Sequence, residues 1–333
     1  MWKKDIVVIG ASAGGLEALQ GLVANLPPGM RASVFVVWHL PPGLKSVLPR
    51  VLAKAGPLQA ETAFDGQEIE PGRIYVAPSD CHMMLEQGFI RVAHGPRENR
   101  FRPAIDPLFR SAAYVYGARV IGVVLSGALS DGTAGLWTIK MRGGTAIAQD
   151  PEEALHPSMP LNAIANVEVD HTAKVAEIGA LLGRITDEAA ALPRELPIDE
   201  ARLIESEVRI AENYADVSLE LFQKSDLSPF TCPECHGVLA RMKTGGVPRF
   251  RCHTGHAVNA DALLDSLQLQ VEAKLGDAAR AIDESVMLLN HIGAHLDKSG
   301  HKDAARRYFE KAKETDERAT PLRELSRADH TPG

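Results

Sequence analysis

The first 190 residues alternate short runs of β-branched residues with stretches of helical periodicity, and this alternation constrains the fold most. Amphipathic stretches such as LEALQGLVANL and PLFRSAAYVYG lie between the runs. Five runs are almost continuously apolar, as in strands buried on both faces: DIVVIG, SVFVVWHL, RIYVAP, RVIGVVLSG and GTAIAQ. The pattern predicts an α/β fold with a doubly wound, mainly parallel sheet. A β-hairpin set into it is predicted from residue 68 to 93, with its turn near Gln87 and Gly88.

After a proline-bearing linker at residues 191–200 the alternation stops, and a different organisation is expected. Residues 200–223 carry apolar positions at helical spacing, and the end of the chain reads as two helices separated near Lys298 to His301. We expect these last helices to pack on helix 200–223 or to form a homodimer. The predicted parts are an α/β domain (1–190), a linker with a helix (191–227), a Cys/His segment (228–258) and a helical hairpin (259–330).

Composition excludes several classes of partner and location. A net charge of −7 argues against nucleic acid, since phosphate binding needs a basic face. No apolar run is long enough for a transmembrane helix, and the apolar stretch after Lys4 is too short for a secretory signal, so no membrane insertion is expected. Three of the four cysteines cluster late in the chain, which favours a cytoplasmic protein with a metal site.

A serine, a histidine and an aspartate each follow a predicted strand. Ser12 lies in GASAG, which matches the G-x-S-x-G turn of an exposed nucleophile. His39 and Asp131 come after two other strands, and the carboxyl ends of parallel strands meet at one sheet edge. Each also has a structural interpretation, Ser12 and Asp131 as helix N-caps and His39 as a hydrogen-bonded strand end. Together they supply a nucleophile, a base and an orienting carboxylate, which favours a hydrolase.

Several motifs, in this order and at these separations, resemble the catalytic domain of the CheB-type protein-glutamate methylesterases of bacterial chemotaxis. The resemblance covers roughly residues 4 to 190 and is carried by GASAGGLEAL, VVWHLPP, IEPGRIYVAPSDCHMML, GPRENRFRPAIDPLFRSAA, LSGALSDGTAGL and GGTAIAQDPEEALHPSMPLNAI. It implies Ser12 as nucleophile, His39 as base and Asp131 as orienting group, with no cofactor for catalysis. The implied reaction hydrolyses glutamate methyl esters of helical chemoreceptor segments to glutamate and methanol, and some members also deamidate glutamine.

The chain departs from the family pattern in two loops and at its start. Ala13 stands where the family commonly has threonine, and Ala128 where it commonly has methionine. Both are expected to donate backbone N–H groups to the oxyanion, so the shape of the substrate pocket is the property affected. The family usually carries a receiver domain ahead of the esterase, whereas here the esterase begins at residue 1. We therefore expect the tail or a separate signalling partner to replace that regulation.

Charged residues near the predicted site allow two interpretations. Arg97, Arg100 and Arg102 form a basic run that would attract a receptor helix rich in glutamate. The alternative is a solvated loop. Asp106 followed by Pro107 has the pattern of an N-cap and first helical residue, so Asp106 is predicted to be structural.

The late cysteines have the spacing of a metal site. Cys232-x2-Cys235 is followed after sixteen residues by Cys252-x3-His256, and the stretch between them reads as a small hairpin. This Cys3His set predicts a closed, structural zinc site, with His236 and His253 as competitors for the fourth position. We expect a chelator to unfold residues 228–257 and to spare the esterase domain.

Three other functions are alternatives to a protein-glutamate methylesterase. An α/β-hydrolase acting on small esters orders its triad Ser, Asp, His, whereas this chain runs Ser, His, Asp. A dinucleotide-binding turn would need glycine at Ser12 and an acid near His39. A catalytically silent signalling scaffold is disfavoured by the intact triad, although Ala13 and Ala128 leave it open.

Overall fold

The structure is a computed structural model that describes residues 2–39, 46–192, 194–242 and 247–328. The two prolines after His39, part of the predicted linker (residue 193), the predicted tip of the small hairpin (243–246) and the last residues of the predicted helical hairpin (329–330) lie outside the described residues. The chain divides into two units, Met1–Leu263 and Leu264–Gly333, and each is described by itself.

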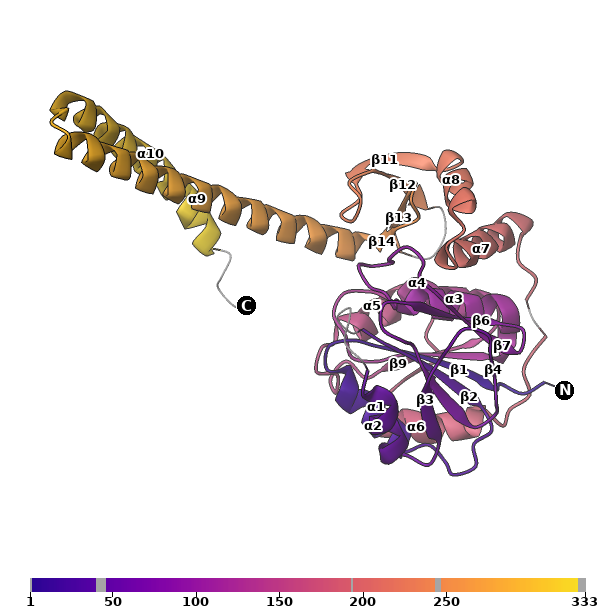
Figure 1. The fold of residues 1–333 in the computed structure, drawn as a ribbon. Coiled ribbons are helices and arrows are strands. Elements are labelled where there is room, and N and C mark those ends of the chain that lie inside the picture. The colour runs from indigo at the N-terminus through magenta and orange to yellow at the C-terminus, as the bar shows by residue number, and fades with distance from the viewer. Residues whose placement is uncertain (1, 40–45, 193, 243–246, 329–333) are drawn as a thin grey trace. The chain divides into compact units, whose positions relative to one another are not determined.

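A seven-stranded sheet forms the centre of the first unit, and all of its strand pairs are parallel (Figure 1). Its order is β10-β9-β8-β1-β2-β5-β3, so the strand order reverses around β1, as in a doubly wound fold. The strands are β1 (Ile6–Ala11), β2 (Ser33–Trp38), β3 (Gln59–Thr62), β5 (Arg73–Val76), β8 (Val120–Val124), β9 (Thr145–Gln149) and β10 (His171–Ala173). The predicted α/β fold is confirmed, and the five apolar runs are β1, β2, β5, β8 and β9.

Helices cover both faces of this sheet and give it two apolar cores (Figure 1). One core packs alternate strand residues such as Val8 and Phe35 against α3, α4 and α5, and the other packs their neighbours against α1, α2 and α6. The helices are α1 (Gly15–Ala24), α2 (Leu48–Ala55), α3 (Ile105–Tyr116), the 3₁₀ turn η1 (Gly117–Arg119), α4 (Thr133–Met141), α5 (Ser158–Asn166) and α6 (Val175–Ile185).

The predicted hairpin is divided between two sheets: residues 73–76 are β5 of the parallel sheet, and the strands around the predicted turn belong to a separate three-stranded sheet. β6 (His82–Glu86) and β7 (Phe89–Ala93) pair in antiparallel fashion around Gln87 and Gly88, and β4 (Gln67–Glu68) adds to β7. Gly88 has a φ of 83°, a left-handed conformation that glycine adopts without strain. The turn therefore lies where the sequence predicts it.

Two helices and a small antiparallel sheet complete the first unit. The single helix predicted at 200–223 is wrong, because the chain forms α7 (Ile198–Ala211) and α8 (Ala215–Gln223). They are separated at Asn213, which has a φ of 79°, and asparagine adopts this conformation more readily than most residues. The sheet has the order β11-β12-β13-β14, with strands β11 (Asp226–Thr231), β12 (Val238–Met242), β13 (Arg249–Cys252) and β14 (Ala257–Asn259).

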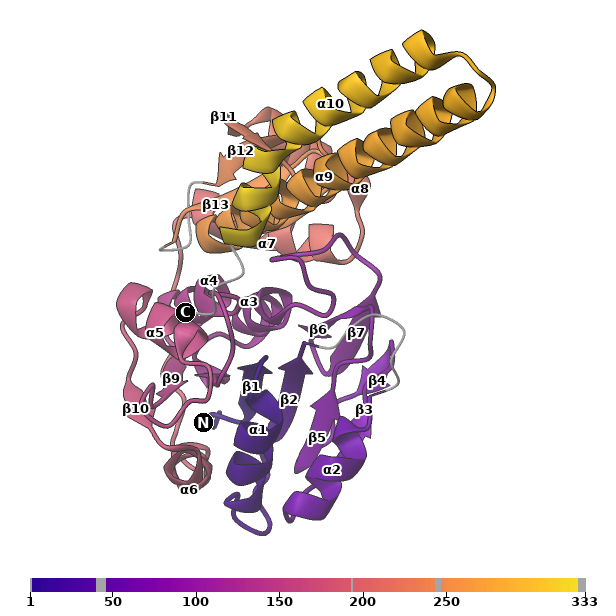
Figure 2. The same ribbon diagram turned by 90° about the vertical axis from the view of Figure 1, so that its left-hand side faces the viewer.

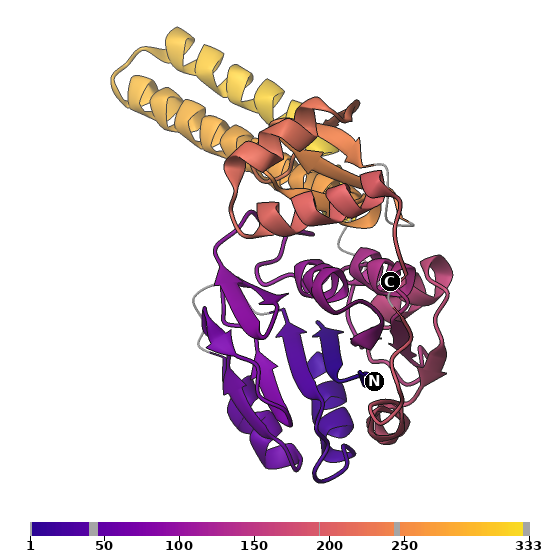
Figure 3. The same cartoon turned by 90° about the vertical axis from the view of Figure 1, so that its right-hand side faces the viewer.

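The second unit consists of the helices predicted at the end of the chain (Figures 2 and 3). α9 (Ala260–Lys298), whose first turn belongs to the first unit, and α10 (Lys302–Ala328) run side by side in opposite directions. Arg323 of α10 forms ion pairs with Asp283 of α9 and Asp316, and the Phe309 ring lies against Gly293. None of the helices in the described part of the chain combines the length and hydrophobicity of a membrane span.

Candidate functional site

Three neighbouring strands bring the predicted triad residues to one edge of the parallel sheet. Ser12 directly follows β1, His39 directly follows β2, and Asp131 lies in the loop between β8 and α4. Because β8, β1 and β2 are adjacent and parallel, the three side chains meet at their shared carboxyl edge. This is the edge at which ligands bind in open parallel sheets.

His39 makes hydrogen bonds to both of the other residues. Its Nδ1 lies 3.0 Å from Ser12 Oγ, and its Nε2 lies 2.9 Å from Asp131 Oδ2. The side chains of His39 and Asp131 are 3% and 2% exposed, so their ion-pair geometry is shielded from water. Phe101 stacks on the imidazole with 3.7 Å between ring centroids and 9° between planes. The ring is thus held on one face and at both nitrogens.

In the bend after β1, the Ser12 side chain is not used to cap the following helix. The N-cap of α1 is Gly14, with a φ of 67° and no side-chain capping bond, so Ser12 is not the N-cap that its structural interpretation required. Its amide donates to Ser126 O at 2.9 Å, and Trp38 Nε1 donates to its carbonyl at 2.9 Å. A Cβ on Gly127 would lie 2.8 Å from Ser12 Cβ, so only glycine permits this approach.

Asp131 accepts hydrogen bonds on both carboxylate oxygens. Ile105 N donates to Oδ2 at 2.7 Å, while Asn99 Nδ2 and Gly132 N donate to Oδ1 at 2.7 Å and 3.0 Å. Burial alone would raise the pKa of Asp131, but His39 and these donors outweigh it and hold the pKa below its ordinary value. The carboxylate is therefore ionised opposite the imidazole.

A second buried carboxyl lies beside the triad. The prediction that Asp106 caps its helix is wrong: α3 begins at Ile105 with Ala104 as N-cap. The Asp106 side chain instead accepts from Gly135 N at 2.7 Å and from Asn99 Nδ2 at 2.9 Å, which ties α3 to α4. Burial and the negative charge of Asp131 raise the pKa of Asp106 to about 7.

The predicted oxyanion and substrate residues lie around this edge in different environments. Ala13 and Ala128 are exposed, and neither amide donates to another group in the described part of the chain. Arg97 forms an ion pair with Glu234 at 3.4 Å, and Arg102 pairs with Asp80 at 2.8 Å. Arg100 lines a small cavity with Cys232 and His256, and it also has an interaction partner within the chain.

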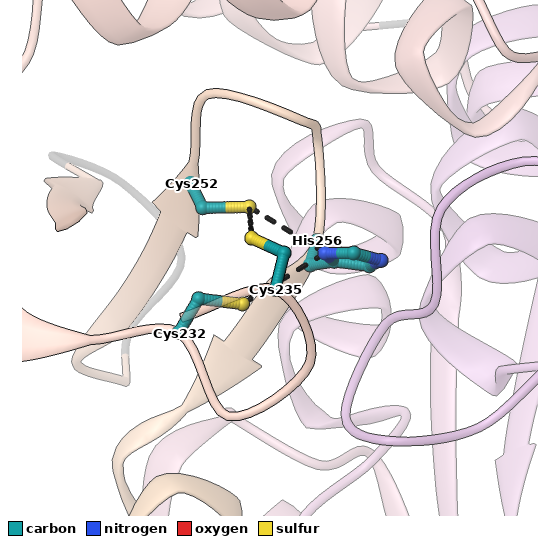
Figure 4. A group of neighbouring side chains, drawn as sticks. All are labelled: Cys232, Cys235, Cys252 and His256. Carbon is teal, nitrogen blue, oxygen red and sulfur yellow. Dashed lines mark hydrogen bonds between the residues drawn. The ribbon is translucent and has the colours of Figure 1, made fainter. Parts of the chain in front are cut away.

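The late cysteines and one histidine form a compact group on the four-stranded sheet (Figure 4). Their ligand atoms all lie within 4.8 Å of one another, and the group consists of Cys232, Cys235, Cys252 and His256. Cys235 Sγ lies 3.6 Å from Cys252 Sγ, and His256 Nδ1 lies 3.6 Å from Cys252 Sγ and 3.8 Å from Cys232 Sγ. Tetrahedral zinc requires about 3.8 Å between sulfurs and about 3.6 Å between sulfur and nitrogen.

Of the three candidates for the fourth position, His236, His253 and His256, it is His256 that faces the sulfurs (Figure 4). His253 lies instead against Gly237 and edge-on to Phe222. None of the four cysteines of the chain, all of which the structure describes, forms a disulfide.

Sequence reasoning missed two residues that support the triad, Asn99 and Phe101. Both lie in the loop 97–102, which drew attention only for its arginines. Asn99 has a φ of 49°, an uncommon conformation, yet a polar residue between charged neighbours carries no sequence signal of its own.

Comparison with known proteins adds a family match for the α/β part of the chain. Residues 7–182 match the family model described as CheB methylesterase. The Cys/His segment and the C-terminal helices lie beyond the end of that match. The crystal structure of the Thermotoga maritima CheB methylesterase catalytic domain is similar, with a TM-score of 0.53 and 35% sequence identity, over 55% of this chain and 98% of that chain.

Curated relatives carry matching names. A protein-glutamate methylesterase/protein-glutamine glutaminase of Anaeromyxobacter dehalogenans is 38% identical over 55% of this chain and 53% of its own length. A protein of that name from Thermotoga maritima is 37% identical over 50% of this chain and 49% of its own length. This chain therefore spans about half the length of these two relatives. A putative one from Leptospira interrogans is 36% identical over 54% of this chain and 94% of its own length.

Proposed function

Because this chain belongs to the CheB methylesterase family, we propose that Ser12, His39 and Asp131 form the catalytic triad of a protein-glutamate methylesterase. The observation that carries the proposal is the position of His39, within hydrogen-bond reach of a serine hydroxyl on one side and an ionised carboxylate on the other. The relatives' names support glutamate methyl esters as substrates and glutamine side chains as a second class.

The geometry supports a two-step reaction. Ser12 Oγ attacks the ester carbonyl while His39 Nδ1 takes its proton, and the tetrahedral intermediate expels methoxide, which leaves as methanol with that proton. Water then attacks the acyl-enzyme, His39 again acts as base, and the free glutamate and Ser12 are regenerated. Asp131 holds the proton-bearing Nε2 of His39 throughout and stabilises the imidazolium.

The negative charge on the intermediate needs donors that are not used elsewhere. The amides of Ala13 and Ala128, two exposed residues, meet this condition, since neither donates elsewhere in the described part of the chain, and they lie in the loops after β1 and β8. We assign them the oxyanion role. Because these are backbone donors, the replacement of the family's threonine and methionine by alanine leaves the donors in place.

We propose a methylated chemoreceptor or receptor-like helical protein as the substrate, acted on in the cytoplasm, where cysteines stay out of disulfides. The charges of Arg97 and Arg102 are compensated by Glu234 and Asp80. Their contact with substrate, together with that of Arg100, stays a prediction. So do the signalling partner that replaces a receiver domain and the homodimer through the C-terminal helices.

The test is methanol release from methylated receptor-bearing membranes by the full chain and by Ser12→Ala. We expect release by the native chain, loss in Ser12→Ala, and no change in Ser206→Ala, which alters a serine on α7 far along the chain. Fluorophosphonate labelling reports on the serine independently of the substrate. Labelling at Ser12 without methanol release would overturn the substrate class, and the absence of both would favour the silent scaffold.

A further inference from the structure

We propose that a zinc-class metal ion bound by Cys232, Cys235, Cys252 and His256 holds the loop that positions Asp131. The metal site would thereby support catalysis from outside the family domain. The catalytic half of this inference rests on the proposed function, whereas the metal site and its hold on the loop do not.

The metal site is built by two tight turns that face each other. In one turn Cys232 N donates to Gly237 O at 2.7 Å and His236 N donates to Cys232 O at 2.9 Å. In the other, Cys252 N donates to His256 O at 3.0 Å and Gly255 N donates to Cys252 O at 3.0 Å. The thiols and the imidazole converge between the turns and fill all four positions of a tetrahedral ion, so none is open to a substrate (Figure 4). A closed Cys3His set of this kind is a structural zinc site.

The strands that carry these turns contain only three to six residues each, so their apolar core is small. Metal binding supplies folding energy in such segments. The ion would connect the end of β13 to the start of β14 and both to the turn after β11. Removing the ion would therefore leave the start of β14 held by its pairing with β13 and by the loop alone, and would loosen it.

β14 pairs with the loop beside the triad. Ala257 N donates to Arg97 O at 3.2 Å, and Asn99 N donates to Ala257 O at 2.8 Å. Asn259 N then donates to the side-chain Oδ1 of Asn99 at 2.9 Å. The strand that follows the ligand His256 thus holds Asn99 by both its backbone and its side chain.

The other end of the Asn99 amide reaches the triad. With Oδ1 accepting from Asn259, Nδ2 points to Asp131 Oδ1 at 2.7 Å. Asn99 and Arg100 have φ values of 49° and 74°, and such left-handed conformations persist only where the surroundings enforce them. The same loop carries Phe101, whose ring stacks on His39. Asn99 and Arg100 are the centre of a tight turn that Glu98 and Phe101 close by donating to each other's carbonyl at 3.2 Å and 2.9 Å, and β14 holds this turn in place at Asn99.

Buried ion pairs join the same two regions. Glu98 accepts from Arg110 of α3 at 2.8 Å and from Arg251 of β13 at 3.0 Å, and each of these side chains is at most 3% exposed. Arg251 also reaches Glu207 of α7 at 2.8 Å. A Cβ on Gly255, in the second metal turn, would lie 2.7 Å from Pro96 Cγ, so the turn packs directly on the loop. Loosening of the small sheet at β13 would therefore disturb a buried, charged contact with the loop beside the triad.

The first experiment measures metal in the purified full chain. We expect about one zinc ion per chain, its loss in Cys235→Ser, and its retention in Cys81→Ser, the matched control outside the group. A native chain that takes up no zinc when supplied with zinc alone would overturn the metal site.

The second experiment strips and restores the ion in the native chain. Hydrogen exchange at residues 97–105 and turnover of a small activated ester are followed together. With zinc removed, we expect faster exchange in this loop and about 10- to 100-fold lower kcat with little change in KM, both reversed by added zinc. Unchanged exchange would overturn the hold on the loop. Faster exchange with unchanged kcat would overturn the positioning of Asp131.

A variant tests Asn99 as the positioning residue without disturbing the metal. Asn99→Gly retains the left-handed backbone and removes only the amide, so we expect unchanged zinc content and about 10- to 100-fold lower kcat. Asn213→Gly, at another left-handed asparagine, is the control and should retain full kcat. Equal kcat for both variants would overturn the role of Asn99. If the proposed function itself is wrong, zinc content and exchange still respond as stated, while no ester turnover is seen in any variant.

Discussion

The parallel sheet and the four-stranded Cys/His sheet are stabilised by different means. β1 and β8 are fully buried and apolar, and helices cover them on both faces. β13 is equally buried, yet two of its four residues are arginines that pair with Glu98 and Glu207. Burial of apolar side chains stabilises any compact packing of them, because the hydrophobic effect is non-directional. Buried ion pairs are more selective, because every arrangement that buries a charge without its partner is strongly destabilised. The difference teaches that apolar packing stabilises the parallel sheet, whereas the small sheet also depends on carboxylates that lie outside it, Glu98 and Glu207.

The largest effect is expected where the two regions meet, at Asp131. Asp131→Asn preserves the shape but offers His39 the wrong hydrogen-bonding partner, so kcat for ester hydrolysis should fall about 10⁴-fold. Steady-state kinetics on the purified chain measure this. Asp187→Asn, at an exposed aspartate, is the control. A loss below about tenfold would mean that His39 does not depend on this carboxylate.

A smaller effect is expected from the ion pairs that join the regions. Burial would raise the pKa of Glu207, but Arg110 and Arg249 outweigh it and hold the pKa well below its ordinary value. Glu207→Gln would leave buried guanidinium groups without their counter-charge and lower the free energy of unfolding by about 3–5 kcal/mol. Denaturant unfolding checks this against Glu205→Gln, an exposed residue of the same helix. Equal free energies of unfolding for the two variants would contradict the claim that buried ion pairs stabilise the four-stranded sheet.

The raised pKa of Asp106 predicts a dependence of stability on pH. The folded carboxyl keeps its proton up to about pH 7, whereas the unfolded one releases it near the ordinary value of 3.8. The stability linked to this proton is complete below 3.8 and is lost as the pH rises through about 7. Between pH 5 and pH 8 the native chain should lose about 2–3 kcal/mol more than Asp106→Asn. Denaturant unfolding of both chains at the two pH values measures this. An equal change in the free energy of unfolding for the native chain and Asp106→Asn would contradict the raised pKa of Asp106.

The smallest effect is expected at the surface. Lys3 and Asp187 form an ion pair with side chains that are 57% and 79% exposed. Lys3→Gln should change the free energy of unfolding by no more than about 0.5 kcal/mol, because water and salt screen such a pair. Denaturant unfolding at low and high salt gives this baseline. If Lys3→Gln lowered the free energy of unfolding as much as Glu207→Gln, burial would not be what makes the Glu207 ion pairs more stabilising than the exposed Lys3–Asp187 pair.

Local patterns in the sequence predicted much of the fold and of the triad. Runs of valine and isoleucine marked the buried strands, and the rule that parallel strands end at one edge brought Ser12, His39 and Asp131 together. The short edge strands β3 and β10 escaped prediction because they are polar and partly exposed. The role of Asn99 escaped because it depends on β14, far along the chain. The same separation explains why the Cys/His segment was expected to be independent of the esterase.

Asn99 and Asn259 are 160 residues apart in the chain, so the ribosome makes Asn99 well before its partner. When the strands of the parallel sheet have left the ribosome, Ser12, His39 and Asp131 are all present, but the partner of Asn99 has not yet been made. A fragment that ends with the family match at residue 182 would contain every triad residue and lack this support. On the mechanism proposed above, a nascent or truncated chain is a poor esterase, and full activity arrives only when the Cys/His segment is complete and loaded with metal.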